Sequence, residues 1–156
     1  MVLILAASCR GNSGIKTGLE GNPIPDFDLI LQDSVTHFPT STLVQGQPVV
    51  FFDFSPWCPY CRAEMEDIIA HMGSLKNIHF CLVTIFPMKD MQGFYKHYHL
   101  ERYPNITVGV DYKDYFGHYF KAPGVPYIAV YNREQKLKTS FIGKTDISDI
   151  RALALR

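Results

Sequence analysis

An apolar run that ends just before a pair of cysteines constrains this chain more than any other feature. The run is "VVFFDF", Val49–Phe54, and its β-branched and aromatic residues are typical of a buried strand. Cys58 and Cys61 follow it and open a segment with apolar residues at helical spacing. These residues are Met65, Ile68, Ile69, Met72 and Leu75. The sequence therefore predicts a cysteine pair at a strand-to-helix junction.

The rest of the chain alternates strand-like and helix-like segments. Strand patterns predict a hairpin that begins at Pro25 and leads into a short turn or helix at Pro39–Val44, strands at 78–86 and 105–111, and a second hairpin over 127–143. Helix patterns lie at 89–101 and at 146–155, where Asp146 is the N-cap, with a short helix or turn at 114–120. This order predicts an α/β fold, with a central mixed sheet, helices on both faces and an N-terminal β-hairpin extension.

Length, charge and cysteine content exclude several other classes of protein. The chain has 156 residues, of which 47% are hydrophobic, so it can bury the core of one domain. Lys+Arg and Asp+Glu each number 15, so no basic face for nucleic acid is expected. Four cysteines are too few and too unevenly spaced for a disulfide-stapled small domain.

The position of the cysteine pair favours redox chemistry. A thiol at a helix N-terminus meets unpaired backbone N–H groups and the positive end of the helix dipole, and both favour the thiolate that attacks disulfides. Cys61, one turn further, is placed to attack the resulting mixed disulfide. A metal site needs about four ligands, and neither Cys81 nor the histidines have such spacing. Cys81 lies in a strand pattern and is interpreted as a buried structural thiol.

Several motifs together resemble the thioredoxin superfamily, and more narrowly its TlpA/ResA-like extracytoplasmic branch. They are "FDFSPWCPYCRAEM", "PIPDFDL", which is similar to the entry strand of that branch, and "PGVPYIAVYN", which is similar to the cis-proline segment. The resemblance covers Pro23 to the C-terminus. It implies a thioredoxin-like fold and a thiol-disulfide oxidoreductase that reduces, oxidises or isomerises protein disulfides. It implies no cofactor beyond the Cys58–Cys61 disulfide and no metal.

The resemblance also implies roles for individual residues. Cys58 and Cys61 would be the reacting thiols, and Pro126 would lie in cis beside them. Glu64 is either an exposed helix carboxylate or an acid that tunes Cys61. The predicted docking surface for protein substrates consists of Trp57, Pro59, Tyr60, Gly124, Val125 and Tyr127.

Asp53 departs from the pattern of that branch, because it stands five residues before Cys58 and not six. Either the loop has lost one residue and Asp53 is the buried proton acceptor of thioredoxins, or Phe52 takes that place and Asp53 faces the other way. The difference matters because one step along a strand reverses the face.

The first residues resemble a bacterial lipoprotein signal. "LAASC" is similar to a lipobox, which implies cleavage before Cys9 and lipidation of its thiol. Residues 1–23 are therefore predicted to be a signal remnant and Gly-rich tether, and residues 24–156 the domain. A flexible linker from Cys9 to Pro25 would span about 22 Å. The expected protein is a monomer in the cell envelope or periplasm, held to the membrane and exchanging electrons with a membrane donor or acceptor.

Two other functions stay open. Ser55-x-x-Cys58-Pro59 faintly resembles the peroxiredoxin Thr-x-x-Cys-Pro, which suggests a thiol peroxidase. The same cysteine pair could also serve a copper or zinc chaperone.

Overall fold

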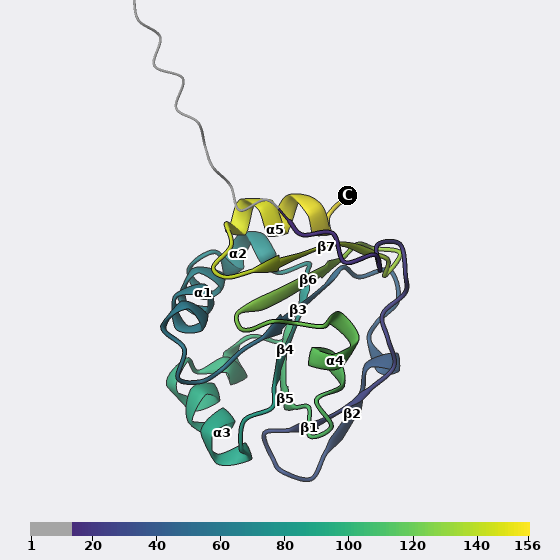
Figure 1. The fold of residues 1–156 in the computed structure, drawn as a ribbon. Coiled ribbons are helices and arrows are strands. Elements are labelled where there is room, and N and C mark those ends of the chain that lie inside the picture. The colour runs from purple at the N-terminus through teal and green to yellow at the C-terminus, as the bar shows by residue number, and fades with distance from the viewer. Residues whose placement is uncertain (1–13) are drawn as a thin grey trace, which may run out of the picture.

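A seven-stranded mixed sheet runs through the structure, a computed structural model that describes residues 14–156 (Figure 1). The strand order is β2-β1-β5-β4-β3-β6-β7. The central strands β3, β4 and β5 are parallel, and the other neighbouring pairs are antiparallel. The strands are β1 (Asp28–Leu31), β2 (His37–Pro39), β3 (Val49–Asp53), β4 (His79–Thr84), β5 (Ile106–Val110), β6 (Tyr127–Tyr131) and β7 (Leu137–Ile142).

Helices cover both faces of the sheet, as predicted. In Figure 1, α1 and α3 lie on one side of the sheet and α4 lies on the other. The helices are α1 (Pro59–Ala70), α2 (Met72–Leu75), α3 (Met88–His97), α4 (Tyr115–Phe120) and α5 (Ile147–Ala154), with 3₁₀ turns η1 (Thr40–Thr42) and η2 (Leu100–Arg102). Asp146 does precede α5, but its side chain makes no capping hydrogen bond there.

Strand alternation divides the core into two clusters. On one face, Phe52 and Phe54 pack with Met65 of α1 and with side chains of α3 and α5. On the other face, Phe51 packs with Phe116 of α4. The cysteine pair begins where β3 leaves the sheet between these two clusters, so the fold holds the start of α1 against a rigid base.

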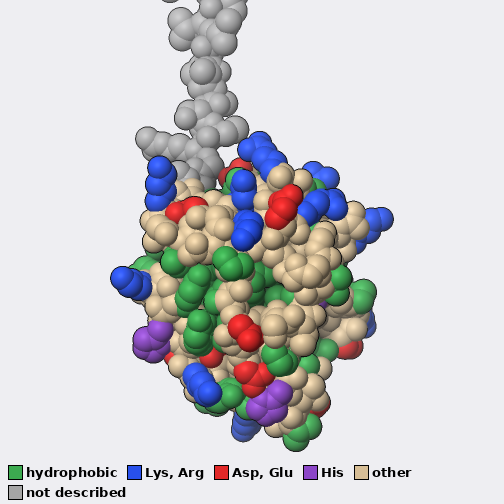
Figure 2. All heavy atoms as spheres, turned by 90° about the vertical axis from the view of Figure 1, so that its right-hand side faces the viewer, with side chains coloured by type: hydrophobic (Ala, Val, Ile, Leu, Met, Phe, Trp, Pro, Cys, Tyr) green, Lys and Arg blue, Asp and Glu red, His purple; other side chains and the backbone are tan. Residues whose placement is uncertain are grey.

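The described part of the predicted tether is not a free linker. Residues 14–24 lie along the edge strand β7, with bridges from Ile15 to Ser140 and from Pro23 to Lys136. The apolar side chains of this segment, those of Ile15, Leu19 and Ile24, pack against the second cluster. Figure 2 shows the molecule from the α4 side of the sheet, where apolar side chains gather at the centre. The domain boundary at residue 24 stays a prediction, and Cys9 lies outside the described residues.

None of the helices within residues 14–156 has the length and apolar character needed to cross a bilayer.

Candidate functional site

The two cysteines lie in different environments at the start of α1. Cys58 is the N-cap residue and is half-buried, and its carbonyl accepts the first helical hydrogen bond from Arg62 N at 3.1 Å. Pro59 occupies the first turn, where its missing N–H removes no helical bond. Cys61 is fully buried among the apolar side chains of the first cluster. Neither cysteine of the pair forms a disulfide in the structure. Because only Cys61 is fully buried, Cys58 is the thiol that a partner can reach.

Burial controls the chemistry of Cys61. It raises the pKa of the Cys61 thiol well above its ordinary value, and contact with Cys58 and the charge of Asp53 act in the same direction. A hydrogen bond from the Ser55 backbone opposes them in part. Cys61 therefore needs a proton acceptor before it can attack a disulfide.

The segment before β6 faces the accessible thiol. The Val125–Pro126 peptide bond is cis, which confirms the prediction from the sequence. Cys58 Sγ lies 3.9 Å from the carbonyl oxygen of Val125. A backbone carbonyl of the bend before β6 thus lies beside the thiol.

Exposed apolar side chains surround this point. Trp57 is 63% exposed and Tyr60 is 66% exposed, and Gly124 is also exposed. A pocket of about 520 Å³ lies between Tyr60, Ile142, Lys144 and the 123–126 segment. Apolar surface of this kind is typical of sites that bind other proteins.

The side chain of Tyr127 does not belong to this surface, and a docking role for its backbone stays a prediction. It is fully buried, because as the first residue of β6 it turns toward the second cluster. Ile142, its neighbour across the β6–β7 pair, is 41% exposed and occupies the pocket wall instead.

Asp53 and Phe52 face opposite sides of the sheet, as strand alternation requires under either alternative, so the role of Asp53 as the buried acid stays a prediction. Phe52 packs on the α1 side, while Asp53 lines a pocket of about 590 Å³ beside α4 and the 122–125 segment. Burial, followed by the charges of Asp114 and Asp111, raises the pKa of Asp53 to about 7, although a backbone hydrogen bond from Phe54 opposes them. Because Asp53 ends its strand, its charge still acts on Cys61 from the opposite face.

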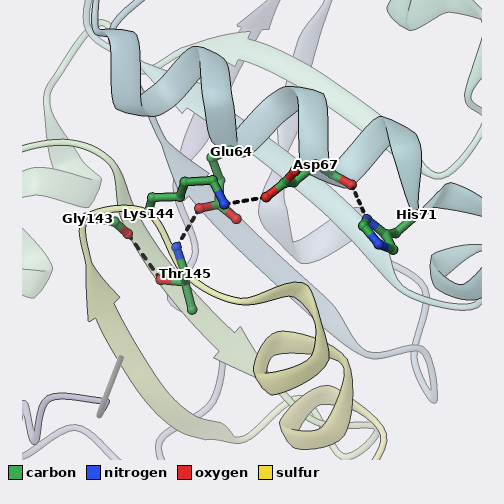
Figure 3. A network of polar contacts seen from close by, with 6 residues as sticks. All are labelled: Glu64, Asp67, His71, Gly143, Lys144 and Thr145. Atoms are coloured by element: carbon green, nitrogen blue, oxygen red, sulfur yellow. Dashed lines mark hydrogen bonds and ion pairs between the residues drawn. The ribbon is translucent and has the colours of Figure 1, made fainter. Parts of the chain in front are cut away.

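Glu64 lies inside the protein and is not an exposed helix carboxylate. Its Oε2 accepts a hydrogen bond from the backbone N–H of Thr145 at 2.7 Å, and Lys144 pairs with Asp67 beside it (Figure 3). Burial raises the pKa of Glu64 to about 7, although the Thr145 N–H and Lys144 act against it. The carboxyl group lies one turn after Cys61 and ties α1 to the loop before α5.

Cys81 is fully buried in β4, in agreement with a structural thiol. Within residues 14–156, no group of three or more His, Cys, Asp or Glu side chains could hold a metal ion. The chaperone alternative therefore depends on the cysteine pair alone.

Sequence reasoning did not find Ile142, Lys144, Asp111 or Asp114. Each is far from the cysteines along the chain. Ile142, Lys144 and Asp114 line the two pockets beside the cysteines, and Asp111 acts on Asp53 through its charge. No local motif marks these four residues.

The sequence is similar to a known protein family and to individual known proteins. The model of the AhpC/TSA family matches residues 21–142. The thiol:disulfide interchange protein DsbE of Escherichia coli is 36% identical over 65 residues, a match that spans 40% of this chain and only 35% of that relative. An uncharacterized protein of Haemophilus influenzae is 27% identical over 132 residues, covering 81% of this chain and 84% of that one.

Solved structures resemble most of this chain. A secreted Mycobacterium tuberculosis disulfide oxidoreductase superposes with a TM-score of 0.61 at 23% identity, covering 72% of this chain and 80% of that one. StoA from Bacillus subtilis superposes with a TM-score of 0.63 at 12% identity, covering 84% and 97%. At these identities the likeness establishes the thioredoxin-like fold.

Proposed function

The chain belongs to the AhpC/TSA family, and from that membership and its cysteine geometry we propose that it is a thiol-disulfide oxidoreductase acting on protein disulfides. The observation that carries the proposal is the asymmetry of the pair. Cys58 is accessible at the start of α1 beside the Val125 carbonyl, whereas Cys61 is buried in contact with it. One thiol can meet a partner and the other can only react inward.

The exchange then has two steps. The Cys58 thiolate attacks a sulfur of the partner disulfide; a Cys58–partner bond forms, the partner S–S bond breaks, and the leaving thiolate takes a proton from water. Cys61 then loses its proton, attacks Cys58 Sγ, forms the Cys58–Cys61 disulfide and releases the partner as a dithiol. Two electrons pass to the partner, and the reverse sequence oxidises a partner dithiol. Isomerisation follows when the released thiol attacks a different sulfur.

Asp53 is the proposed acceptor of the Cys61 proton. A carboxyl group with a pKa of about 7 is a stronger base than an ordinary aspartate, and it can gain or lose a proton near neutral pH. Glu64 has a similar pKa, but the Thr145 N–H already holds one of its oxygens, so its proposed part is smaller.

The partner docks along the cis-proline segment. Trp57, Pro59 and Tyr60 flank the reactive thiol on one side, and Gly124 and Val125 present backbone groups to an extended partner strand on the other. The protein is proposed to work as a monomer, with the Cys58–Cys61 pair as its redox group.

The proposed location is the cell envelope, with Cys9 lipidated and a membrane protein as electron donor or acceptor. Protein disulfides persist in that compartment. Mass spectrometry of protein from its source is expected to find a diacyl or triacyl modification on Cys9. An intact Met1 in a cytoplasmic fraction would contradict this location and leave the exchange chemistry untouched.

Mixed-disulfide trapping tests the activity. Cys61→Ala is expected to accumulate covalent complexes with partner proteins, visible on non-reducing gels, because the attacking thiol remains and the resolving one is absent. Cys58→Ala is the matched control and is expected to trap almost nothing. The opposite pattern would reverse the two roles, and no trapping by either variant would reject the proposal.

A thiol peroxidase remains the second candidate because of the family match. A peroxidatic cysteine needs an arginine close to it, and the guanidinium of Arg62 instead donates from Nε to the Pro56 carbonyl at 2.9 Å. Peroxide turnover by the purified dithiol protein at a rate above that of free thiols would favour this candidate over disulfide exchange. Stoichiometric copper or zinc retained after dialysis would favour the chaperone.

A further inference from the structure

Asp114 is held in an unusual position at the start of α4. It is the residue before the helix and has a left-handed backbone conformation, with φ of 50°. Its side chain folds over the first turn, in the space that a side chain at position 117 would fill. A Cβ built on Gly117 would lie 2.3 Å from Asp114 Oδ1, which is too close for any real contact. The glycine thus leaves room for this carboxylate.

Asp114 shares a pocket with Asp53. The two side chains line the same cavity of about 590 Å³, together with His118 and Lys121 of α4. His118 Nδ1 lies 3.4 Å from the other Asp114 oxygen, Oδ2, and its side chain is 78% exposed. The Asp114 side chain is itself 43% exposed, so its carboxylate lies at the solvent-accessible part of the pocket.

The remaining titratable groups near Asp53 come from three other elements. Asp111, after β5, is buried and accepts a hydrogen bond from Phe116 N at 2.7 Å. The thiols of Cys58 and Cys61 lie at α1, and Tyr127 of β6 pairs with Asp53 in register. On β4, the residue paired with Asp53 is the apolar Val83. Lys121 and His118 are exposed at the mouth of the pocket, whereas Asp111 is buried.

We propose that Asp114 is a positioning residue for the exchange reaction: its carboxylate, placed by the absence of a side chain at Gly117, shares the pocket of Asp53 and makes Asp53 a stronger base toward Cys61. This inference rests on the proposed function, since it assigns a partner to the proton acceptor of that reaction. Among the causes that raise the pKa of Asp53, the charge of Asp114 stands second, after burial and before Asp111. A nearby like charge has this effect because it disfavours the ionised form. The α4 segment would thus adjust a reaction that takes place on β3 and α1.

Direct titration of Asp53 tests the inference. The carboxyl ¹³C shift of Asp53 is followed by NMR in the reduced full-length protein and in Asp114→Asn. Asparagine tolerates the left-handed conformation, so the variant is expected to fold. Its Asp53 pKa should fall by about half a unit or more, because one like charge has been removed. Asp114→Glu, which keeps the charge, should restore most of the shift.

Gly117→Ala provides an independent variant that leaves both acids in place. Alanine is favourable in a helix, but its Cβ must displace the Asp114 carboxylate. The Asp53 pKa is expected to fall in this variant as well. Glu134→Gln is the matched control, because it removes one exposed negative charge in the β6–β7 turn, at the opposite end of the sheet from Asp53. An Asp53 pKa unchanged in Asp114→Asn, or lowered equally by Glu134→Gln, would overturn the inference.

The pH profile of the resolving step supplies the functional readout. Release of partner from a preformed Cys58 mixed disulfide should rise with pH as Asp53 ionises. In Asp114→Asn this rise in the release rate should move to lower pH by the same amount as the Asp53 titration. The release rate at pH values above the Asp53 pKa should fall, because Asp53 is then a weaker base. If the titration moves and the profile does not, Asp53 is not the acceptor and the inference fails. The trapping experiment judges disulfide exchange separately, because Cys61→Ala needs no proton acceptor for its attack.

Discussion

Glu64 is a carboxyl group that folding removes from water, and this ties stability to pH. Its pKa is about 7 in the folded protein against 4.5 as the ordinary value. Between those pH values the folded chain keeps a proton that the unfolded chain releases, so the free energy of unfolding falls as pH rises through this window. Above about pH 7 both states are ionised and the loss is complete. Glu64→Gln should remove this loss, since an amide oxygen can still accept the Thr145 N–H bond.

Urea unfolding at about pH 5 and pH 8 measures this prediction. Between pH 5 and pH 8 the free energy of unfolding of wild type should fall by about 1–3 kcal/mol more than that of the variant, at about 1.4 kcal/mol per pKa unit. Asp53 contributes with the same sign in the same window, but it is present in both proteins and cancels. A stability difference equal at both pH values would show that Glu64 does not titrate as described.

The N-terminal hairpin joins the rest of the sheet through a close contact between strands β1 and β5. Strand β1 pairs with β5, and a Cβ at Gly109 would lie 2.7 Å from Leu29 Cβ and 3.2 Å from the Ile30 carbonyl oxygen. Gly109→Ala should therefore push β1 away from β5 and destabilise the protein by about 1–3 kcal/mol, the usual cost of overpacking. Chemical denaturation measures the loss.

Gly93→Ala is the control for this substitution. Gly93 lies in α3 with no atom within 4 Å of its would-be Cβ, so alanine should stabilise the helix by about 0.5–1 kcal/mol. If the two variants behave alike, the contact between β1 and β5 is not tight in solution.

The whole molecule closes one edge of its sheet with its own N-terminal segment. Gly21 N donates to the Leu137 carbonyl at 2.9 Å, and Leu137 N donates to the Asn22 carbonyl at 3.0 Å, so residues 14–24 occupy backbone groups of β7. A chain truncated to begin at Asp26 should lose about 1–3 kcal/mol through exposure of apolar side chains, and its free edge should promote self-association. Denaturation and analytical ultracentrifugation measure the two effects.

A chain that begins at Gly14 is the control for this truncation. It keeps the paired segment and removes only residues before it, so it should match the full chain in stability and remain as soluble. If the chain that begins at Asp26 were as stable and as monomeric as the chain that begins at Gly14, β7 would not need its cover.

Local pattern determined much of this protein from sequence alone. The apolar run of β3, the helical spacing after Cys61 and the short alternation of the other strands predicted the elements, because each signal depends on residues that are neighbours in the chain. The thioredoxin resemblance predicted the cis bond before Pro126, which the structure confirms.

Only the tertiary structure decided the environment of the acids and the membership of the docking surface. The face of Asp53 depended on one step of register where β3 leaves the sheet, and the sequence left both alternatives open. Glu64 is buried because the loop before α5 covers it, Tyr127 because β6 turns it inward, and Asp114 reaches the Asp53 pocket because Gly117 leaves space. Burial and electrostatic coupling depend on which distant segments pack together, and the spacing of residues along a chain does not contain that information.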